Sequence, residues 1–192
     1  MSDESSSEEQ PKSATSSSSA ILVRTLSYSY SAGQTALTEI NFSVATGTRT
    51  AVVGPSGAGK STLLMHLNGL LPEPLSQEAS TASVLIHDVA LTKETATEIR
   101  RRVGFVFQDP DDQLFCPTVR EDVAFGPMNL GLNRDEVLAR VETSLEQVGL
   151  TGYEFRSTLQ LSVGEKRRVC LTEACAPHQI VGTELHPIQH II

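Results

Sequence analysis

The chain has 192 residues, 39% of them hydrophobic and 20% charged, which suits one α/β domain with a sizeable core but not two complete domains. Its net charge of −8 argues against general nucleic-acid binding, because that function needs a basic surface. No apolar run approaches the ~20 residues that span a bilayer, and the N-terminus is acidic, unlike a signal peptide. We therefore expect a globular protein of the cytoplasm.

The first 19 residues differ in composition from the rest of the chain. They contain nine serines and no aromatic or branched aliphatic residue. Such a segment cannot bury enough apolar surface to offset the entropy lost on ordering. We predict a disordered, serine-rich acidic tail over residues 1–19.

Two strands are predicted directly after this tail. Residues 21–23 open the first strand, and apolar and aromatic residues continue it with a period of two over residues 26–30. Residues 31–34 form a turn, and residues 36–44 form the second strand. A second turn around Gly47 leads into the next segment.

Residues 50–62, with the sequence Thr-Ala-Val-Val-Gly-Pro-Ser-Gly-Ala-Gly-Lys-Ser-Thr, are the most informative part of the chain. Residues 51–53 predict a buried strand, the motif Gly-x4-Gly-Lys-Ser follows at residues 54–61, and a helical apolar pattern begins at Leu63. Strand, loop and helix in this order are typical of a phosphate-binding loop. The alternative is a chance glycine-rich turn before a helix.

The chemistry of phosphate binding explains the residue types in this loop. Phosphate oxygens must approach backbone N–H groups, which small residues permit, and a helix that begins near Gly59 adds its positive dipole end. Lys60 is expected to reach the β- and γ-phosphates, Ser61 to ligate Mg²⁺, and Thr62 to help hold the phosphates. The predicted nucleotide-binding residues of the loop are Gly54, Pro55, Ser56, Gly57, Ala58, Gly59, Lys60, Ser61 and Thr62.

Further strands and helices follow the loop helix, which should end at residues 68–69. Apolar and polar residues alternate weakly over residues 83–88, which predicts an edge strand. Residues 93–102 predict a short helix with a basic last turn. Residues 103–107 predict a buried strand, and residues 108–112 form the loop at its carboxyl end. Open α/β sheets place their ligands at this end of the strands.

The second half of the chain is predicted to be mainly helical. Residues 118–132 predict one or two short helices, residues 134–148 a clearer amphipathic helix, and Ser162 the start of another. The basic groups 100–102 and 166–168 are interpreted as solvated helix ends.

Two further motifs carry a resemblance to a known family. Residues 108–115, Gln-Asp-Pro-Asp-Asp-Gln-Leu-Phe, and residues 161–168, Leu-Ser-Val-Gly-Glu-Lys-Arg-Arg, follow the phosphate loop in the order found in ATP-binding cassette (ABC) ATPases. The chain resembles that family over residues 21–177. Residues 122–132 are similar to the subgroup that powers energy-coupling-factor importers for cobalt, nickel and vitamins.

This resemblance implies a fold and a domain organisation. The expected fold is α/β: the three-layer core of a P-loop NTPase with an antiparallel β subdomain and a helical subdomain, incomplete at the C-terminus. The implied domains are the tail of residues 1–19, a partial ABC ATPase domain over 20–177 with its helical subdomain at about 117–161, and an atypical tail over 178–192.

The resemblance also implies roles for residues outside the phosphate loop. Tyr30 matches the aromatic residue that stacks on adenine, with a core aromatic as the alternative, whereas Tyr28 is assigned to the core. Gln108 matches the Gln-loop residue, whose amide reaches Mg²⁺ or the attacking water and whose loop touches the membrane partner. The resemblance thus implies catalytic roles for Lys60 and Gln108, and Mg²⁺ ligation by Ser61 and Gln108.

Residues 161–165 resemble the signature motif, which closes over the γ-phosphate of ATP held by a partner cassette. Ser162 is a good N-cap, and a helix N-terminus offers amides and a dipole to an anion. Ser162 and Gly164 are therefore candidate nucleotide-binding residues, with an ordinary capped surface helix as the alternative. Val163 departs from the family's glycine and places a β-branched side chain near the expected phosphate.

The chain departs from the family after the signature helix. The family has an apolar strand ending in Asp-Glu there, which holds Mg²⁺ through water and polarises the attacking water. Only residues 180–181 resemble that strand, and Glu184 has no aspartate before it. We interpret the chain as a cassette truncated or frame-shifted near Pro177, with weakened folding and low turnover on its own.

Neither the cysteines nor the C-terminal histidines predict a metal site. The cysteines are odd in number and lack metal-ligand spacing, so reduced structural thiols are expected at Cys116, Cys170 and Cys175. Pro187 lies between His186 and His190, and no carboxylate or thiol completes a ligand set with them and His178.

The function implied by the resemblance is that of the ATP-binding subunit of an energy-coupling-factor importer for a metal ion or vitamin. Its implied cofactors are ATP and Mg²⁺. Its implied partners are a second ABC ATPase subunit, identical or not, and a transmembrane component, so that it would lie at the cytoplasmic face of the membrane. No nucleic-acid partner is expected. The alternatives are a nucleotide-binding subunit that does not hydrolyse ATP, an inert cassette fragment, and a soluble cassette protein of repair or translation.

Overall fold

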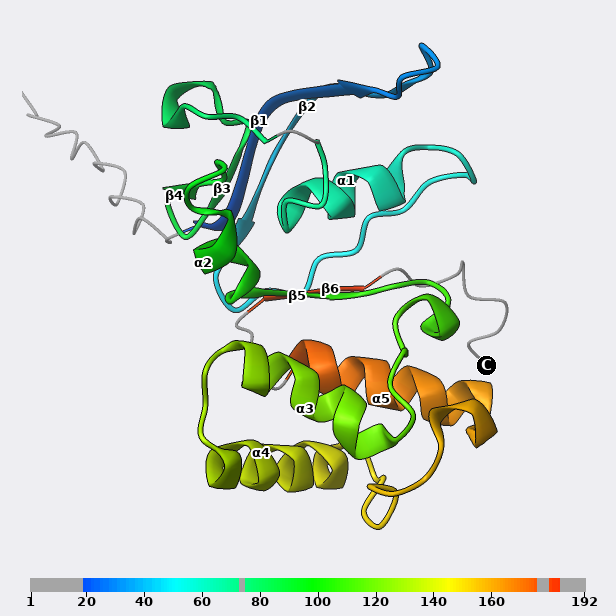
Figure 1. Ribbon diagram of the computed structural model, residues 1–192. Helices are drawn as coiled ribbons and strands as arrows, with labels where there is room; N and C mark the ends of the chain where they lie inside the picture. Colours follow the sequence, from blue (N-terminus) through cyan, green and yellow to red (C-terminus); the bar gives the residue numbers. More distant parts are fainter. Residues whose placement is uncertain (1–18, 73–74, 176–179, 184–192) are drawn as a thin grey trace, which may run out of the picture.

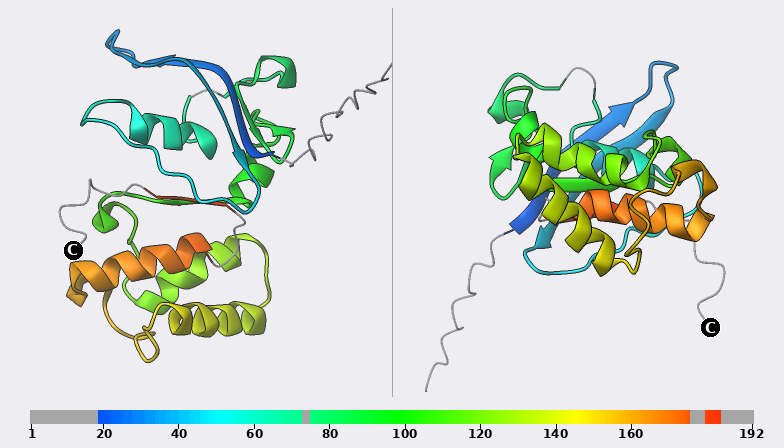
Figure 2. Two further views of the ribbon diagram at one scale, coloured as in Figure 1. Left: turned by 180° about the vertical axis from the view of Figure 1, so that it is seen from behind. Right: turned by 60° about the horizontal axis from the view of Figure 1, so that its bottom comes forward.

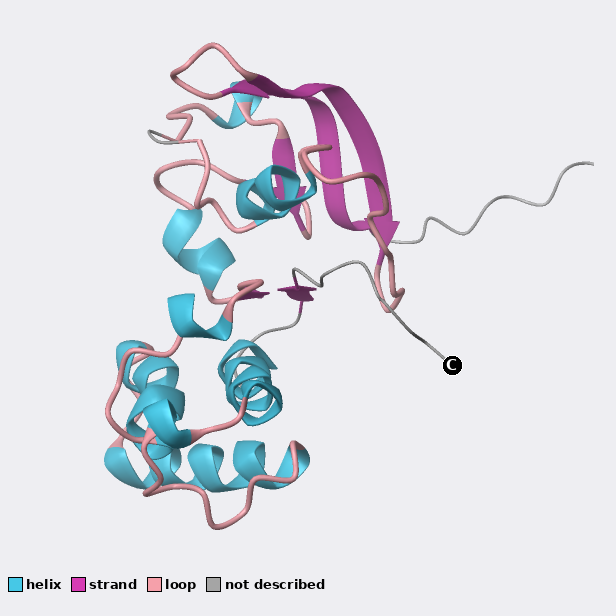
Figure 3. Ribbon diagram, turned by 90° about the vertical axis from the view of Figure 1, so that its right-hand side faces the viewer, coloured by secondary structure: helices cyan, strands magenta, loops and turns pink. Residues whose placement is uncertain are grey.

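The computed structural model describes residues 19–72, 75–175 and 180–183, so the predicted tails 1–19 and 178–192 lie almost entirely outside the described residues. Figure 1 shows four layers: an antiparallel sheet, a helix beneath it, a pair of parallel strands, and a group of helices. The left view of Figure 2 and Figure 3 show the same order from other sides. No helix in the described part of the chain is long and apolar enough to cross a membrane.

The antiparallel sheet begins with the predicted hairpin. Strand β1 (Ser19–Ser29) pairs with β2 (Thr35–Ala45), which confirms both predicted strands, and on its other edge β1 pairs with β3 (Val84–Ile86). The strand order is β2-β1-β3-β4, with Ile21 opposite Ile86. One face of this sheet carries the apolar side chains that form the upper core.

The third strand differs from the sequence prediction in length and place. Residues 83–88 were expected to form an edge strand, but β3 is internal and ends at Ile86. His87 and Asp88 have positive φ angles of 46° and 63°, the backbone of a tight hairpin turn. The chain therefore reverses there, and the two-residue strand β4 (Val89–Ala90) becomes the edge.

Helix α1 (Lys60–Leu67) packs beneath this sheet together with α2 (Ala96–Arg100). The Arg100 guanidinium of α2 donates hydrogen bonds to the carbonyls of Asn68 and Gly69, which satisfies acceptors at the C-terminal end of α1. The residues buried in this upper core are Ala20, Ile21, Val23, Leu26, Leu37, Leu63, Leu67, Val84, Ile86, Leu91, Ala96, Ile99 and Val103.

A pair of parallel strands forms the middle layer. Strand β5 (Val103–Val106) pairs with β6 (Ile180–Thr183), with Val103 opposite Ile180 and Val106 opposite Thr183. After the signature helix, the sequence predicts the family's strand only through the resemblance of residues 180–181. The structure corrects this view, because four residues pair there with β5. Helix α1 and helix α5 (Val163–Cys175) lie on opposite sides of this pair (Figure 1).

The lower layer consists of α5 with α3 (Val119–Asn129) and α4 (Arg134–Gln147). Helix α3 is one helix that contains Pro127, and capping boxes begin both α3 and α4, the latter through Asn133 and Glu136. Short 3₁₀ turns lie at Ala79–Thr81, Pro110–Asp112 and Thr158–Gln160. The buried residues of this lower core are Val119, Val123, Ala124, Val137, Val141, Leu145, Leu150, Leu161 and Val169.

The apolar run before the phosphate loop contradicts its prediction as a buried strand. Residues 51–53 form no strand, and Val52 and Val53 are 43% and 88% exposed. In the described part of the chain, β5 and β6 make a sheet of two strands only, so this run has no hydrogen-bonded neighbour on either side. Without hydrogen bonds to a neighbouring strand, the backbone of this run is solvated, and the β-branched side chains stay exposed.

This correction predicts that Val53 contributes little to stability. We expect Val53→Thr to change the free energy of unfolding by no more than about 0.5 kcal/mol, as is usual for exposed positions. Val103→Thr, the matched change at a position only 5% exposed, should cost about 1–3 kcal/mol because it buries a hydroxyl without a partner. Urea unfolding of both variants tests this. An equal loss in the two would show that residues 51–53 are buried in solution.

Candidate nucleotide-binding site

The glycine-rich loop of residues 54–59 lies between the exposed run 51–53 and α1. Gly57 and Gly59 have φ angles of +80° and +82°, and Gly59 is the N-cap of α1. A Cβ atom at Gly59 would lie 2.4 Å from the carbonyl oxygen of Ala36 in β2, closer than real contacts allow. Strand β2 therefore presses against the start of α1, and only glycine fits there.

The Lys60 ammonium group folds back over this loop. Its Nζ atom donates hydrogen bonds to the carbonyl oxygens of Gly54 (3.0 Å) and Pro55 (2.7 Å). The Ala58 N–H donates to the Pro55 carbonyl at 3.3 Å, which closes a turn in the loop. The loop thus holds a positive charge at the N-terminal end of α1, where the helix dipole is also positive, and this combination favours an anion.

Ser61 and Thr62 in the first turn of α1 face different surroundings. Ser61 is half-buried, whereas Thr62 is 6% exposed and its Oγ1 lies 2.9 Å from the Tyr30 hydroxyl. The Thr62 side chain is therefore engaged with Tyr30.

Tyr30 lies beside the phosphate loop and not in the core. Its side chain is 41% exposed, and its ring packs edge-to-face on Tyr28 with centroids 5.0 Å apart. Tyr28 in turn packs against the buried His66 at 4.7 Å and against the upper core, as expected. Burial lowers the pKa of His66, which keeps this layer uncharged. The structure thus brings an exposed aromatic ring and the glycine-rich loop to the same end of α1.

Gln108 is exposed and follows β5 by two residues. The loop continues through Asp109, whose carboxylate accepts the N–H of Asp111 at 3.0 Å and so starts the 3₁₀ turn Pro110–Asp112. Because β5 and β6 are parallel, this loop lies next to the end of β6 at Thr183. Among the described residues, no hydrogen bond joins Gln108 to Lys60 or to the glycine-rich loop.

The start of α5 is built by a capping interaction. The Glu165 carboxylate accepts hydrogen bonds from the Ser162 N–H (2.8 Å), the Ser162 hydroxyl (2.7 Å) and the Tyr153 hydroxyl (2.8 Å). The bonds from Ser162 lower the pKa of Glu165 to about 2. Val163 is 62% exposed, and a Cβ at Gly164 would meet nothing within 4 Å. This N-terminus is therefore open, but α1 and its loop lie on the other side of the strand pair (Figure 1).

Three polar residues near the Gln108 loop were missed or misinterpreted from the sequence. Lys166 was interpreted as part of a solvated helix end, but its side chain is 14% exposed and pairs with Asp111. Gln113 and Glu173 were not singled out, although they connect the Gln108 loop to α5. The available signal was the position of Lys166 and Glu173 seven residues apart, on one face of a helix.

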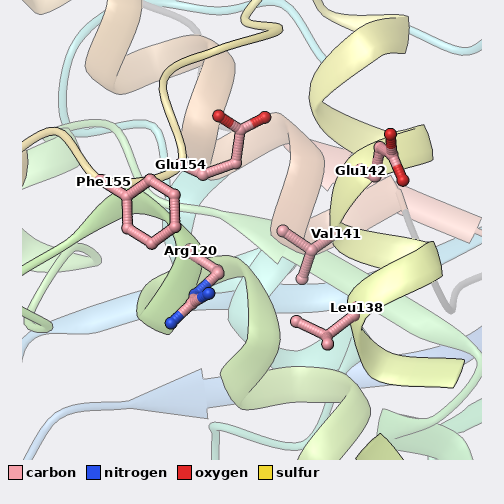
Figure 4. Close-up of a pocket in the computed structure, with 6 residues that line it drawn as sticks. All are labelled: Arg120, Leu138, Val141, Glu142, Glu154 and Phe155. Carbon is pink, nitrogen blue, oxygen red and sulfur yellow. The ribbon is translucent and has the colours of Figure 1, made fainter. Parts of the chain in front are cut away.

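The thiols and the remaining cavity lie apart from the phosphate loop. Cys116 and Cys170 are free, and burial raises their pKa values to about 11 and about 12. No group of three metal-ligating side chains occurs among the described residues, which exclude His178, His186 and His190. A cavity of about 270 Å³ in the lower layer (Figure 4) is lined by Arg120, Leu138, Val141, Glu142, Glu154 and Phe155.

A glycine-rich loop that opens a helix, with a lysine folded over it, defines the class of P-loop nucleotide-binding proteins. The ABC transporter family model matches residues 37–181. A solved structure titled cbiO1 from Clostridium perfringens, part of the ABC transporter complex cbiONQ, superposes with a TM-score of 0.69 at 35% identity, covering 83% of this chain and 62% of that one. The chain therefore belongs to the ABC transporter family, and the predicted ABC ATPase fold is confirmed.

Curated relatives extend this comparison. The chain is 56% identical over 153 residues to the energy-coupling factor transporter ATP-binding protein EcfA of Methanothermobacter thermautotrophicus, covering 79% of this chain and 47% of that protein. It is 47% identical over 146 residues to EcfA1 of Methanospirillum hungatei, covering 76% of this chain and 50% of that protein. The chain thus spans about half the length of the curated relatives that it matches.

The contact between Gly59 and β2 predicts a difference between two glycines of the loop. Both have a positive φ, so Gly57→Ala and Gly59→Ala should each cost about 1–2 kcal/mol in backbone strain. Only Gly59→Ala also places a methyl group against the Ala36 carbonyl, so it should lower the melting temperature several degrees further. Thermal unfolding of the two variants measures this, and equal losses would contradict the contact.

Proposed function

We propose that this chain is the ATP-binding subunit of an energy-coupling-factor type ABC importer. The observation that carries the proposal is the phosphate loop itself, in which the Lys60 ammonium group lies over the glycine-rich loop at the N-terminal end of α1. The exposed Tyr30 ring lies beside this loop. The names of the curated relatives, which describe ATP-binding proteins of energy-coupling factor transporters, support the same function.

In this proposal the triphosphate takes the place of the carbonyls that Lys60 now contacts. The Lys60 ammonium group now donates to the uncharged carbonyl oxygens of Gly54 and Pro55. It would exchange them for the negatively charged β- and γ-phosphates, which form stronger hydrogen bonds with a cation. The amides of the loop and the first turn of α1 bind the remaining oxygens. Tyr30 supplies a flat surface for adenine.

The residues at this end of α1 also suit Mg²⁺. Magnesium prefers oxygen ligands and retains several waters, so a hydroxyl and an amide oxygen are appropriate donors. Ser61, half-buried in the first turn of α1, and the exposed Gln108 would hold the ion in this proposal. The ion would supply charge neutralisation between the β- and γ-phosphates.

The sequence of β6 favours nucleotide binding over rapid hydrolysis. Phosphoryl transfer to water needs a group that orients the attacking water at the strand end beside the Gln108 loop. The four residues of β6 are Ile-Val-Gly-Thr and carry no carboxylate. Glu184 lies outside the described residues. We therefore keep a non-hydrolysing, nucleotide-binding subunit as the second candidate function.

Two surfaces support the proposed partners. The open N-terminus of α5, with Ser162 and Gly164, lies across the strand pair from this chain's own loop, which supports a role in binding ATP held by a second cassette and not this chain's own. Near the Gln108 loop, Phe115 and Phe125 are 65% and 47% exposed and pack edge-to-face at 4.8 Å. We propose that this aromatic pair contacts a transmembrane component at the cytoplasmic face of the membrane, and that this component selects cobalt, nickel or a vitamin.

The role of Lys60 can be tested by thermal unfolding with Mg·ATP. At a concentration near 100 times Kd, ATP should stabilise the folded chain by about 2.7 kcal/mol, a rise of several degrees in melting temperature. Lys60→Ala should lose most of this rise, whereas Lys93→Ala, at an exposed lysine remote from the loop, should keep it. The absence of any rise in the wild-type chain would refute the proposed function and favour an inert fragment.

The role of Tyr30 can be tested by comparing ATP with inorganic tripolyphosphate. Tyr30→Leu should weaken Mg·ATP binding about 5- to 150-fold, the equivalent of about 1–3 kcal/mol for base stacking. Binding of tripolyphosphate, which has no base, should change far less. Tyr30→Phe keeps the ring and loses only the contact with Thr62, so it should bind ATP nearly as the wild type does. Equal weakening for both ligands in Tyr30→Leu would show that the ring does not contact adenine.

A further inference from the structure

A glutamine side chain connects the end of β5 to the signature helix. The Gln113 Oε1 atom accepts the backbone N–H of Phe107 at 3.2 Å, and Phe107 directly precedes Gln108. The Gln113 Nε2 atom donates to the Glu173 carboxyl at 2.8 Å and to the Cys170 carbonyl at 3.2 Å, both in α5. One amide group therefore bridges the Gln108 loop and α5.

Two further contacts lie on the same face of α5. Lys166, Cys170 and Glu173 follow the i, i+4, i+7 spacing of one helix face. Lys166 forms an ion pair with Asp111, and the Cys170 thiol lies 3.9 Å from the Pro110 carbonyl oxygen. This face of α5 therefore contacts the segment 110–113 that follows Gln108. The last residue of the segment, Gln113, makes its contacts at Cys170 and Glu173.

We propose that Gln113 and Glu173 form a clamp that fixes the backbone at Phe107 and Gln108 to α5, which makes Gln113 a positioning residue for Gln108. The clamp rests on the proposed function only in taking the ligand of Gln108 to be nucleotide-bound Mg²⁺ or its attacking water. Because Ser162 and Gly164 begin the same helix, the clamp makes the Gln108 loop and the signature motif move together.

The charge state of Glu173 adds a pH dependence to this clamp. Burial raises the pKa of Glu173 to about 8; the hydrogen bond from Gln113 opposes this shift, and Asp122 of α3 adds to it. Cys116 and Cys170 also lie in this electrostatic environment, and burial raises both of their pKa values. The second carboxyl oxygen of Glu173 is buried without a hydrogen-bond partner among the described residues, as is one oxygen of Asp122. A protonated Glu173 therefore fits this site better than an ionised one.

The sign of the effect on stability follows from this shift. Between pH 4.5, the ordinary pKa of a glutamate, and about 8, the folded chain binds a proton at Glu173 that the unfolded chain does not. Stability from this group is therefore present at low pH and is lost as the pH rises through that window. Glu173→Gln replaces the carboxyl with a neutral amide and removes this dependence.

The first experiment measures hydrogen exchange of the Phe107 backbone amide by NMR without nucleotide. Gln113→Ala removes its acceptor and should speed exchange about three- to tenfold, the equivalent of one typical hydrogen bond. Gln147→Ala, at an exposed glutamine ending α4, is the matched control and should leave the Phe107 rate unchanged. An unchanged Phe107 rate in Gln113→Ala would overturn the clamp.

A charge swap separates the clamp from a general loss of folding. Gln113→Glu alone removes the Nε2 group that donates to the Glu173 carboxyl and to the Cys170 carbonyl, and it should loosen the loop. The double variant Gln113→Glu with Glu173→Gln restores one amide and one carboxyl with their positions exchanged, and it should return the Phe107 exchange rate toward that of the wild type. Failure of the double variant to recover, although its melting curve remains cooperative, would refute the proposed pair.

The pH dependence is measured by melting temperature between pH 5.5 and 8.5. The wild type should lose more stability than Glu173→Gln as the pH rises, and Glu146→Gln, at an exposed glutamate of α4, should follow the wild type. Parallel curves for the wild type and Glu173→Gln would show that Glu173 does not titrate in this window in the folded chain and would overturn the pH dependence.

The positioning role is measured by Mg·ATP affinity in a double-mutant cycle of Gln113→Ala and Gln108→Ala. If Gln113 acts through Gln108, the double variant should bind no more weakly than Gln108→Ala alone. Additive losses would refute the positioning role. A wild-type chain that binds no ATP would refute the proposed function, whereas the exchange and melting experiments would still decide on the clamp.

Discussion

The close approach of Gly59 to strand β2 is the constraint on which the site depends. With the loop glycine pressed against the Ala36 carbonyl, the N-terminus of α1 is fixed to the edge of the antiparallel sheet. The hydrogen bond between Tyr30 and Thr62 ties the end of the β1 segment to the same turn of helix. The Tyr30 ring and the N-terminal end of α1 therefore keep one geometry relative to each other, and this would reduce the entropy lost on the proposed binding of ATP.

Much of the fold was predictable because its signals are local. The hairpin of β1 and β2, the start of α1 at Gly59, and α4 with its cap at Asn133 are each encoded within about a dozen neighbouring residues. The glycine-rich loop belongs to the same group, since its residue types follow from phosphate chemistry alone. The placement of Tyr30 beside this loop needed the family resemblance, because no local pattern distinguishes an exposed strand-end tyrosine from a core one.

The predictions that failed concern interactions between distant segments. An apolar run such as residues 51–53 becomes a buried strand only where neighbouring strands supply hydrogen bonds, and the sheet in the described residues stops at β6. Lys166 looked solvated because its partner, Asp111, lies 55 residues earlier in the chain. Gln113 and Glu173 were missed for a similar reason: the helical spacing of Lys166 and Glu173 indicates a shared face of α5, but it does not identify Gln113, 60 residues earlier, as the partner.

This division between local and distant signals bears on function. The groups proposed to contact the phosphates and the base of ATP are residues 54–62 and Tyr30, which lie on or beside elements of the upper core. In the proposed function, hydrolysis would also need a water-orienting group at the end of β6 and a correctly placed Gln108, whose loop contacts α5. The groups proposed for binding and those proposed for turnover therefore lie in different layers of the molecule. Because Ser162 begins the same helix that contacts the Gln108 loop, the proposed clamp would let a second cassette that closed over Ser162 act on Gln108 through Glu173 and Gln113.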